Sequence, residues 1–273
     1  MLLVIDAGNT NTVLGLYDLD VEPSKLVSDW RITTPVHQTA SEFGVILANL
    51  FSLSKLDMSL VDGIAVSSVV PPLDPILKEV CALYFGGKNK IKPLFIEPGI
   101  KTGLPVLTDN PSEVGADRIV NCVAAFDALG GPTIVVDMGT ATTFDVISKK
   151  GEFLGGAIAP GLRISADALF ARAARLPRVD IKRPAKVIGT NTVDNMQIGL
   201  YYGYIGLVDG ILERMIAELG AETKVVATGG LAKLIAGGSK FITTVDDMLT
   251  LTGLRIIYER NHKTRRQANP GQL

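Results

Sequence analysis

The chain has 273 residues, of which 47% are hydrophobic and 20% are charged, so it can build one large core or two medium-sized ones and is neither disordered nor fibrous. Its 27 basic and 28 acidic side chains leave a formal net charge of −1. This balance gives no long-range attraction to nucleic acid or to an anionic membrane surface, and we expect neither as a partner. An anionic ligand must therefore be held by local groups.

The start of the chain predicts a buried first strand. Residues 1–5 are apolar, no basic residue precedes them, and the run ends at Asp6, which is not the pattern of a signal peptide. No apolar run approaches the roughly 18 residues that span a bilayer. The closest candidate, residues 199–219, carries charged side chains at Asp209, Glu213 and Arg214 and predicts a soluble helix.

The cysteines and histidines form no metal-binding pattern. Cys81 and Cys122 are isolated from each other, and His37 and His262 stand apart from both, so no spacing typical of a metal site occurs. We interpret the cysteines as buried thiols in a reducing compartment and expect a cytoplasmic protein.

Strands and helices alternate in the first half of the chain. Thr39 and Glu42 have capping-box spacing ahead of a helical pattern. Residues 63–70 predict a buried strand that Pro71 and Pro72 end. Residues 110–113 predict another helix start.

The most informative feature is an internal echo. Residues 2–12 return as residues 133–143, and in each copy an apolar run ends in Asp-x-Gly before small hydroxyl or amide residues. A second β-prone segment follows each copy, at residues 13–17 and 144–147, which predicts a strand, a glycine-containing turn and a returning strand. A repeat this long indicates a duplicated domain and not a solenoid.

Two features in the second half bear on packing and binding. Gly199, Gly203, Gly206 and Gly210 recur along one helical segment, which predicts close approach of another backbone, either within the chain or from a second subunit. Residues 224–232 predict a strand that ends in Gly-Gly before a helix. We expect the last residues to form a polar tail.

The two Asp-x-Gly turns suit phosphate binding. Backbone N–H groups of such a turn can face a phosphate, while the Asp6 carboxylate can hold the Mg²⁺ that accompanies it. One such turn is most often an ordinary hairpin, but two in register resemble the facing phosphate turns of the actin, hexokinase and Hsp70 superfamily. The strand at residues 224–228 and the Gly-Gly after it resemble that superfamily's adenosine-binding turn, although a tight strand-to-helix connection would look the same. Neither a P-loop nor a Rossmann motif occurs.

This resemblance implies a duplicated α/β actin-like (ribonuclease H-like) fold with two similar mixed-sheet domains and an ATP cleft between them. We place an N-terminal domain at residues 1–117, a C-terminal domain at residues 118–256 and the polar tail at residues 257–273.

A narrower resemblance rests on residues 109–118, which read Asp-Asn-Pro-Ser-Glu-Val-Gly-Ala-Asp-Arg. Together with the two Asp-x-Gly turns, residues 155–161 and Asn191-Thr192, this segment is similar to the type III pantothenate kinases along nearly the whole chain. Taken alone, Asp117-Arg118 would be only a surface pair at the start of a helix.

The family resemblance implies a role for each matching residue. Asp117 would be the general base that takes a proton from the hydroxyl of pantothenate as it attacks ATP. Asp137 would ligate a monovalent cation, K⁺ or NH₄⁺. Asp6 would help to hold the Mg²⁺ that accompanies the ATP phosphates. The substrate would contact Gly115, Ala116, Asp117, Arg118 and Thr192. ATP would contact Asp6, Ala7, Gly8, Asn9, Thr10, Asn11, Thr12, Val13 and Thr140. The resemblance also implies a homodimer with pantothenate bound near its interface.

One position departs from the family pattern. Thr108 stands where the family usually has a tyrosine that contacts pantothenate, and its shorter side chain removes an aromatic wall. This departure leaves one alternative open, a kinase of the same superfamily acting on another small alcohol. A second alternative, a nucleotide-binding regulatory protein without turnover, stays open because the family has relatives described as transcriptional accessory factors. Asp6, Asp117 and Asp137 argue against the second, because a purely regulatory chain has no chemical need for all three.

Overall fold

The computed structural model describes residues 1–85 and 91–268, the last six of these as backbone only. Its α/β chain divides into two compact units, each built around a five-stranded mixed sheet. Unit 1 comprises Met1–Leu104, Asn110–Ala124 and Thr250–Leu273, and unit 2 comprises Pro105–Asp109 and Ala125–Leu249.

The sheet of unit 1 has the order β3-β2-β1-β4-β5. Strands β1 to β3 form an antiparallel meander, and β4 and β5 then add parallel to β1. The elements are β1 (Leu2–Ala7), β2 (Asn11–Asp18), β3 (Lys25–Thr33), α1 (Ala40–Leu53), β4 (Gly63–Ser68), α2 (Asp74–Phe85), β5 (Leu94–Phe95), the first part of α3 (Ala116–Leu129) and α7 (Leu249–Ala268), with 3₁₀ turns at Met58–Leu60, Pro71–Leu73 and Pro111–Glu113.

Unit 2 repeats this topology with the order β10-β9-β6-β7-β8. Its meander is antiparallel, and β9 and β10 add parallel to β6. The internal echo in the sequence is thus confirmed as a duplicated sheet. The elements are β6 (Thr133–Met138), β7 (Ala141–Ile147), β8 (Phe153–Pro160), α4 (Leu162–Arg172), α5 (Thr192–Leu219), β9 (Lys224–Thr228), α6 (Ala232–Ala236) and β10 (Thr244–Val245).

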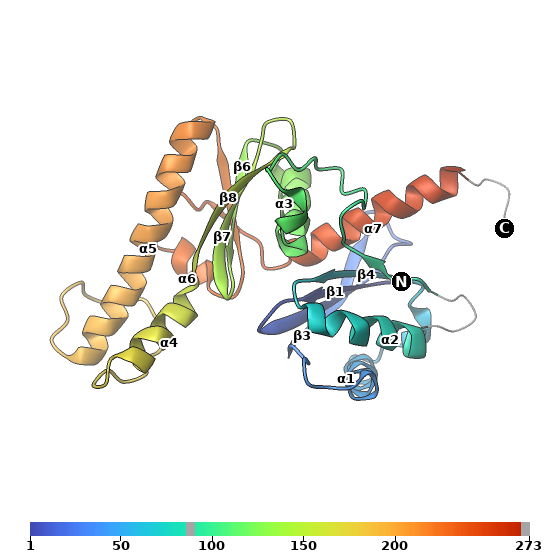
Figure 1. Ribbon diagram of the computed structural model, residues 1–273, viewed down its shortest axis with the longest axis horizontal. Helices are drawn as coiled ribbons and strands as arrows, with labels where there is room; N and C mark the ends of the chain where they lie inside the picture. The colour runs from blue at the N-terminus through green and yellow to red at the C-terminus, as the bar shows by residue number, and fades with distance from the viewer. Residues whose placement is uncertain (86–90, 269–273) are drawn as a thin grey trace. The chain divides into compact units, whose positions relative to one another are not determined.

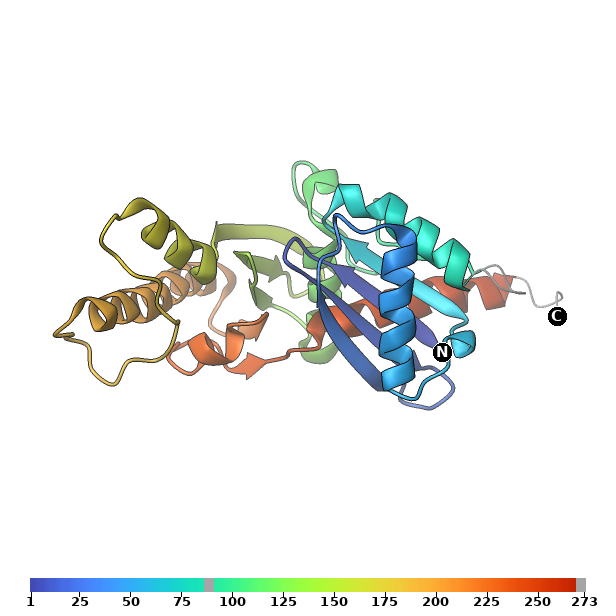
Figure 2. The ribbon, with the colours of Figure 1, turned by 90° about the horizontal axis from the view of Figure 1, so that it is seen from below.

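Each sheet is covered by helices because its strands are apolar on both faces. In unit 1, α1 and α2 cover the face that carries Leu3, Ile5 and Val66, as Figure 2 shows with α1 in front of the strands. Helix α7 covers the opposite face, where Gly15 leaves room for Leu251. In unit 2, α5 and α6 cover the equivalent core face.

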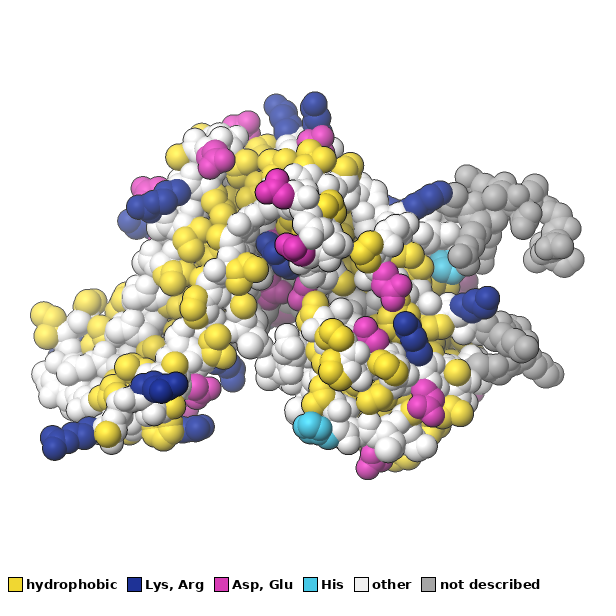
Figure 3. All heavy atoms as spheres, viewed as in Figure 1, with side chains coloured by type: hydrophobic (Ala, Val, Ile, Leu, Met, Phe, Trp, Pro, Cys, Tyr) yellow, Lys and Arg dark blue, Asp and Glu magenta, His cyan; other side chains and the backbone are white. Residues whose placement is uncertain are grey.

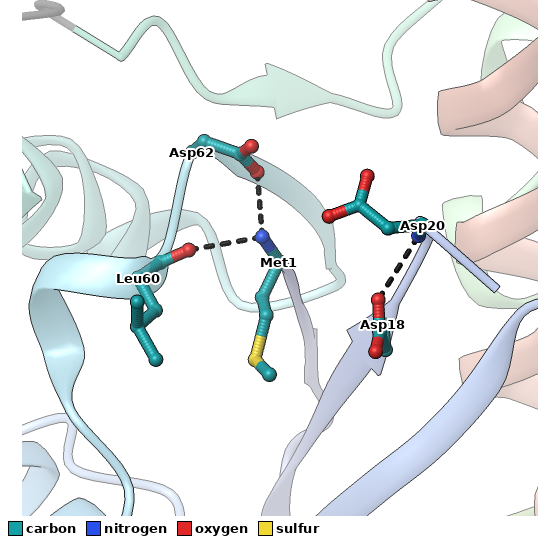
Figure 4. A network of polar contacts seen from close by, with 5 residues as sticks. All are labelled: Met1, Asp18, Asp20, Leu60 and Asp62. Atoms are coloured by element: carbon teal, nitrogen blue, oxygen red, sulfur yellow. Dashed lines mark hydrogen bonds and ion pairs between the residues drawn. The ribbon is translucent and has the colours of Figure 1, made fainter.

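The first strand is anchored at its very start (Figure 4). The Met1 ammonium group donates to the carbonyl of Leu60 and to the Asp62 carboxylate, both at 2.9 Å. The two Met1 contacts fix where β1 begins, and the register of β1 in turn places Asp6. The turn after β2 is closed locally, where the Asp20 N–H donates to the Asp18 carboxylate at 2.9 Å.

Several expected elements are confirmed. Thr39 and Glu42 form both hydrogen bonds of a capping box at the start of α1. The strand expected after residue 62 is β4, and the 3₁₀ turn at Pro71–Leu73 follows it. Both cysteines are buried and neither forms a disulfide, and burial raises the pKa of Cys81 to about 12.

The helix start expected at residues 110–113 is different in the structure. Asn110 caps a separate 3₁₀ turn, and the extended backbone of Val114 separates it from α3, which begins at Ala116. The motif residues Gly115 to Arg118 therefore lie at the first turn of α3, with a sharp corner before them.

The two units also differ from the domain boundaries expected from the sequence. The division runs through α3 at residues 124 and 125, and the chain returns to unit 1 from Thr250. The sequence predicts a polar tail from residue 257. In the structure that residue lies inside α7, and both Ile257 and Tyr258 are buried. Tyr258 packs where Gly63 has no side chain, a contact that joins segments too distant in the sequence to predict. Residues 269–273 of the expected tail lie outside the described part of the chain.

Among the described residues, no helix has both the length and the apolarity needed to cross a membrane. On the face shown in Figure 3, Lys and Arg side chains are interspersed with Asp and Glu and form no continuous basic area. The absence of a nucleic-acid or membrane partner stays a prediction.

Candidate functional site

The first candidate turn joins β1 to β2. The strand ladder pairs Asp6 with Val13 and Ala7 with Thr12. Within the turn, the Gly8 N–H donates to the Asn11 carbonyl at 3.1 Å. Asn9 and Thr10 are exposed at its tip and Thr12 is buried beneath it. The sequence therefore presents two polar residues on a closed backbone turn, as a phosphate-binding loop requires.

Thr34, the residue after β3, holds this first turn in place. Its N–H donates to the Thr10 carbonyl at 3.1 Å, and its hydroxyl donates to the Gly8 carbonyl. The buried Thr12 hydroxyl donates to Thr34 Oγ1 at 3.3 Å. The turn is thus bound to the rest of the sheet, which fixes its shape before any ligand arrives.

The second turn, between β6 and β7, is one residue shorter than the first. Here Met138 pairs with Thr142, and the Gly139 N–H donates to the Ala141 carbonyl at 3.0 Å. In the internal echo of the sequence, Thr12 aligns with Thr143. The strand register shows instead that Thr142 is the buried residue equivalent to Thr12. The shortening cannot be read from the sequence because both alignments preserve threonine.

Gly161 plays the part in unit 2 that Thr34 plays in unit 1. It follows β8, and its N–H donates to the Thr140 carbonyl at 3.1 Å. A Cβ at Gly161 would lie 2.1 Å from that carbonyl oxygen, so no other residue fits without moving the turn. Beneath the turn, the Thr142 hydroxyl shares a hydrogen bond with the Tyr204 hydroxyl of α5. This places the exposed Thr140 at a fixed position.

Asp137 and the Gly-Gly turn meet in unit 2. Asp137 pairs in register with Thr228, the last residue of β9. Gly229 follows with a φ of +94°, and a Cβ there would lie 2.8 Å from Asp137 Oδ1. The structure thus brings the second Asp-x-Gly turn and the expected adenosine turn together at Asp137, and they approach so closely that only glycine fits at position 229.

The Asp117 carboxylate lies at the start of α3. Asp117 Oδ1 accepts a hydrogen bond from the Arg118 N–H at 2.8 Å. Gly115 packs towards Val69, just beyond the end of β4, and its missing Cβ would lie 2.7 Å from Asp117 Oδ1. Ala116 and Arg118 are half-buried beside it. The motif therefore holds one carboxylate against the end of the unit 1 sheet.

Burial raises the pKa of Asp117 above the ordinary aspartate value of 3.8. Loss of hydration is the main cause, and the N–H and positive charge of Arg118 oppose it only in part. The N-terminus of α3 also favours the charged form, so desolvation outweighs several stabilising groups. A carboxylate with a raised pKa is a better proton acceptor than an exposed one.

Thr192 does not join the other predicted residues of unit 2. It is exposed at the first residue of α5, twelve residues before Tyr204, a separation of about 18 Å along the helix. It lines a hollow of about 490 Å³ formed by α4, α5 and the segment between them. The second turn and Thr192 therefore lie at different places in the same unit.

Thr108 lies on unit 2 beside β8. The segment that carries it pairs with β8 through Leu107, whose N–H donates to the Phe153 carbonyl at 2.9 Å. The Thr108 methyl group is 3.8 Å from the position of a Cβ at Gly155, and its hydroxyl oxygen is buried with no hydrogen-bond partner among the described residues.

The oxygen groups present fit a cation held partly by a nucleotide. The described residues contain no cluster of three or more His, Cys, Asp or Glu side chains that could hold a metal alone. Mg²⁺ in kinases commonly uses one or two carboxylates, water and the phosphates of the substrate, so Asp6 beside the first turn is a suitable donor.

Three residues of the site were missed in the sequence. Thr34 and Tyr204 carry no local signal, because their contacts with the turns come from strand order and helix packing. Gly161 was noticed only as part of a motif, and its close approach to Thr140 explains the glycine.

Comparison with known proteins places the chain in a family. Residues 2–214 match the family model described as type III pantothenate kinase. The chain is 59% identical to the type III pantothenate kinase of Koribacter versatilis, with 100% of both chains covered. It is 58% identical to that of Acidobacterium capsulatum, with 98% of each covered.

Solved structures share the fold at low sequence identity. A 2-dehydro-3-deoxygalactonokinase protein from Sinorhizobium meliloti matches with a TM-score of 0.60 and 13% identity, covering 95% of this chain and 99% of that one. A Baf family transcriptional activator from Campylobacter jejuni matches with a TM-score of 0.55 and 19% identity, covering 96% and 99%. The expected actin-like α/β fold is thereby confirmed. By its full-length identity and the family match, the chain belongs to the type III pantothenate kinases.

Proposed function

We propose that this chain transfers the γ-phosphoryl group of ATP to the primary hydroxyl of pantothenate, which forms 4′-phosphopantothenate in the first step of coenzyme A biosynthesis. Membership of the type III pantothenate kinase family is the observation that carries this proposal. The raised pKa of Asp117 supports it, because the reaction needs a proton acceptor.

In the proposed reaction, Asp117 is the general base. Its carboxylate takes the proton of the substrate hydroxyl, the hydroxyl oxygen forms a bond to the γ-phosphorus, and the bond from that phosphorus to the β–γ bridging oxygen breaks to release ADP. Gly115 and Ala116 line the substrate site, and Arg118 pairs with an anionic oxygen. The fixed first turn of α3 keeps these groups in position.

Residues 6–13 and Thr140 bind the ATP phosphates in this proposal. The closed turn around Gly8, held by Thr34, presents its polar tip to the phosphates without rearrangement. Bound Mg²⁺ would neutralise charge on the β- and γ-phosphates. Asp6 orients the water that surrounds this ion.

Asp137 is the proposed ligand of a monovalent cation, K⁺ or NH₄⁺. The carboxylate supports this placement, since hard oxygen donors suit such a cation. The cation would balance phosphate charge at the second turn.

We also propose a cytoplasmic homodimer that uses the glycine face of α5. Apart from chain neighbours and the nearby backbone of α5 itself, no heavy atom of the described residues lies within 4 Å of a Cβ placed at Gly199, Gly203 or Gly206, so packing against other parts of the chain does not account for these glycines. Thr192 begins the same helix. In this proposal the substrate binds near the dimer interface and is contacted by Thr192.

The test measures ADP release by the purified chain with ATP, Mg²⁺ and pantothenate, with and without K⁺, beside Asp117→Asn. Turnover that needs pantothenate and K⁺ and is lost in the variant supports the substrate, the cation and the base. If ATP is bound while pantothenate is left unchanged, the proposal fails, and the shorter Thr108 directs the search to other small alcohols.

A further inference from the structure

Ser67, at the end of β4, carries a buried hydroxyl that the unliganded chain does not use. The residue is fully buried, and its Oγ has no hydrogen-bond partner among the described residues. Most buried hydroxyls in proteins are paired, because an unpaired one loses its hydration without compensation. The position of Ser67 indicates what this hydroxyl is for.

The strand ladder sets Ser67 beside Asp6. Strands β1 and β4 are parallel neighbours (Figure 1), and Ser67 pairs in register with Asp6. The pairing continues past both residues, where the Val69 N–H donates to the Ala7 carbonyl at 3.1 Å. Backbones in this arrangement lie about 4.8 Å apart, so a serine hydroxyl can reach the neighbouring carboxylate by rotation of its side chain.

Both side chains lie on the same face of the sheet. The opposite face carries Ile5 and Val66, which belong to the core beneath α1 and α2. Side chains alternate along a strand, so Asp6 and Ser67 share the face opposite this core. They also share the carboxyl end of the parallel strands, where ligands bind in open α/β sheets.

The second half of the chain repeats this arrangement. Thr228 ends β9, is buried, and pairs in register with Asp137 as Ser67 pairs with Asp6. A hydroxyl residue thus accompanies each acidic turn residue, although the sequences of β4 and β9 differ. The recurrence indicates a role tied to the carboxylate and not to local packing.

We propose that Ser67 is a positioning residue for Asp6. When Mg–ATP binds, the Ser67 hydroxyl donates a hydrogen bond to the Asp6 carboxylate and holds it towards the water around Mg²⁺. Asp6 engages other groups in the unliganded chain, so this bond forms as the ligand draws the carboxylate into its working orientation. The inference rests on the proposed use of Mg–ATP at the first turn.

The test compares Ser67→Ala, Ser67→Thr and a matched control, Thr133→Val. Thr133 is equally buried, but its hydroxyl donates to the Gly130 carbonyl at 2.7 Å, and it begins β6 at the end away from Asp137. Each protein is assayed for the Tm without ligand, for the rise in Tm caused by Mg²⁺ with a non-hydrolysable ATP analogue, and for the Mg²⁺ dependence of kcat and KM.

Ser67→Ala is expected to keep or raise the unliganded Tm, to lose most of the rise caused by Mg²⁺ and the analogue, and to lower activity about 10–100-fold, as removal of groups that orient metal ligands does. Added Mg²⁺ should recover part of that activity. Ser67→Thr should restore the rise in Tm. Thr133→Val should show the reverse pattern, a lower unliganded Tm with an unchanged response to ligand.

Two results would overturn the proposal. If Mg²⁺ and the analogue raise the Tm of Ser67→Ala as much as that of the wild type, the hydroxyl has no role in ligand binding. If the unliganded Tm of Ser67→Ala falls strongly and all functions are lost in proportion, the role of Ser67 is purely structural. The binding readout needs no pantothenate. A wild-type chain that fails to phosphorylate pantothenate would therefore refute the proposed function, while the Tm response of the variants would still decide the role of Ser67.

Discussion

Replacing Gly161 by alanine would place a methyl group where the second turn already lies. The added Cβ would be 2.1 Å from the Thr140 carbonyl oxygen and 2.7 Å from that of Gly139, whereas ordinary contact begins at 3.4 Å. The turn must therefore retreat by about 1.3 Å, and the hydrogen bond from the Gly161 N–H to Thr140 must bend or break. Both neighbouring atoms belong to the backbone, so no flexible side chain can absorb the change.

A shift of this size at a phosphate-binding turn should lower both activity and stability. Misplacement of about 1 Å can lower catalysis about 10²-fold, which corresponds to about 2.7 kcal/mol of transition-state stabilisation. Overpacking should destabilise the fold by about 1–3 kcal/mol. The expected result for Gly161→Ala is therefore a variant that still folds, with a lower Tm and a kcat/KM for ATP reduced about 100-fold.

Steady-state kinetics with varied ATP, together with thermal and urea unfolding, test this prediction. Gly237→Ala is the matched control, because its Cβ would make only ordinary contacts at 3.6 and 3.7 Å, with backbone of its own short helix. Activity of Gly161→Ala within twofold of wild type would refute the reasoning, since it would mean that the turn either moves freely or does not bind phosphate.

Four further outcomes are expected. Burial raises the pKa of Asp117, so ionisation of this carboxyl group opposes folding. Its contribution to the free energy of unfolding is fully present below the pKa of the unfolded state and is lost as pH rises through the raised pKa of the folded state. Asp117→Asn should therefore lower kcat about 10²–10⁴-fold and keep or raise the unliganded Tm at pH 7, and a marked fall in Tm would contradict this account. Thr39→Ala should lower the free energy of unfolding by about 1 kcal/mol in urea titrations by removing the cap bonded to the Glu42 N–H at 3.3 Å; an unchanged midpoint would count against it. Gly206→Glu should give a folded monomer in analytical ultracentrifugation, whereas an intact dimer would exclude this face of α5. Thr108→Val should raise the KM for pantothenate more than it lowers kcat, because it removes a buried hydroxyl without a partner, and unchanged kinetics would show that this hydroxyl does not meet the substrate.

Elements that depend on local order could be predicted from the amino-acid sequence. The apolar run before Asp6 predicts β1, the spacing of Thr39 and Glu42 predicts the capping box, and the echo of the first turn around Asp137 predicts the duplicated sheet. These features depend on residues close together along the chain, or on a repeat that is visible as such. The candidate carboxylates could therefore be named from the sequence.

How those residues are held depends on contacts that form when the chain packs. The hydrogen bonds from Thr34 and Gly161 to the two turns follow from strand order, and the register of β1 with β4 sets Ser67 beside Asp6. The return of α7 to unit 1 depends on the space at Gly63 for Tyr258. Such contacts join segments tens to hundreds of residues apart. Local propensity does not encode them, because they form only when the sheets and helices pack.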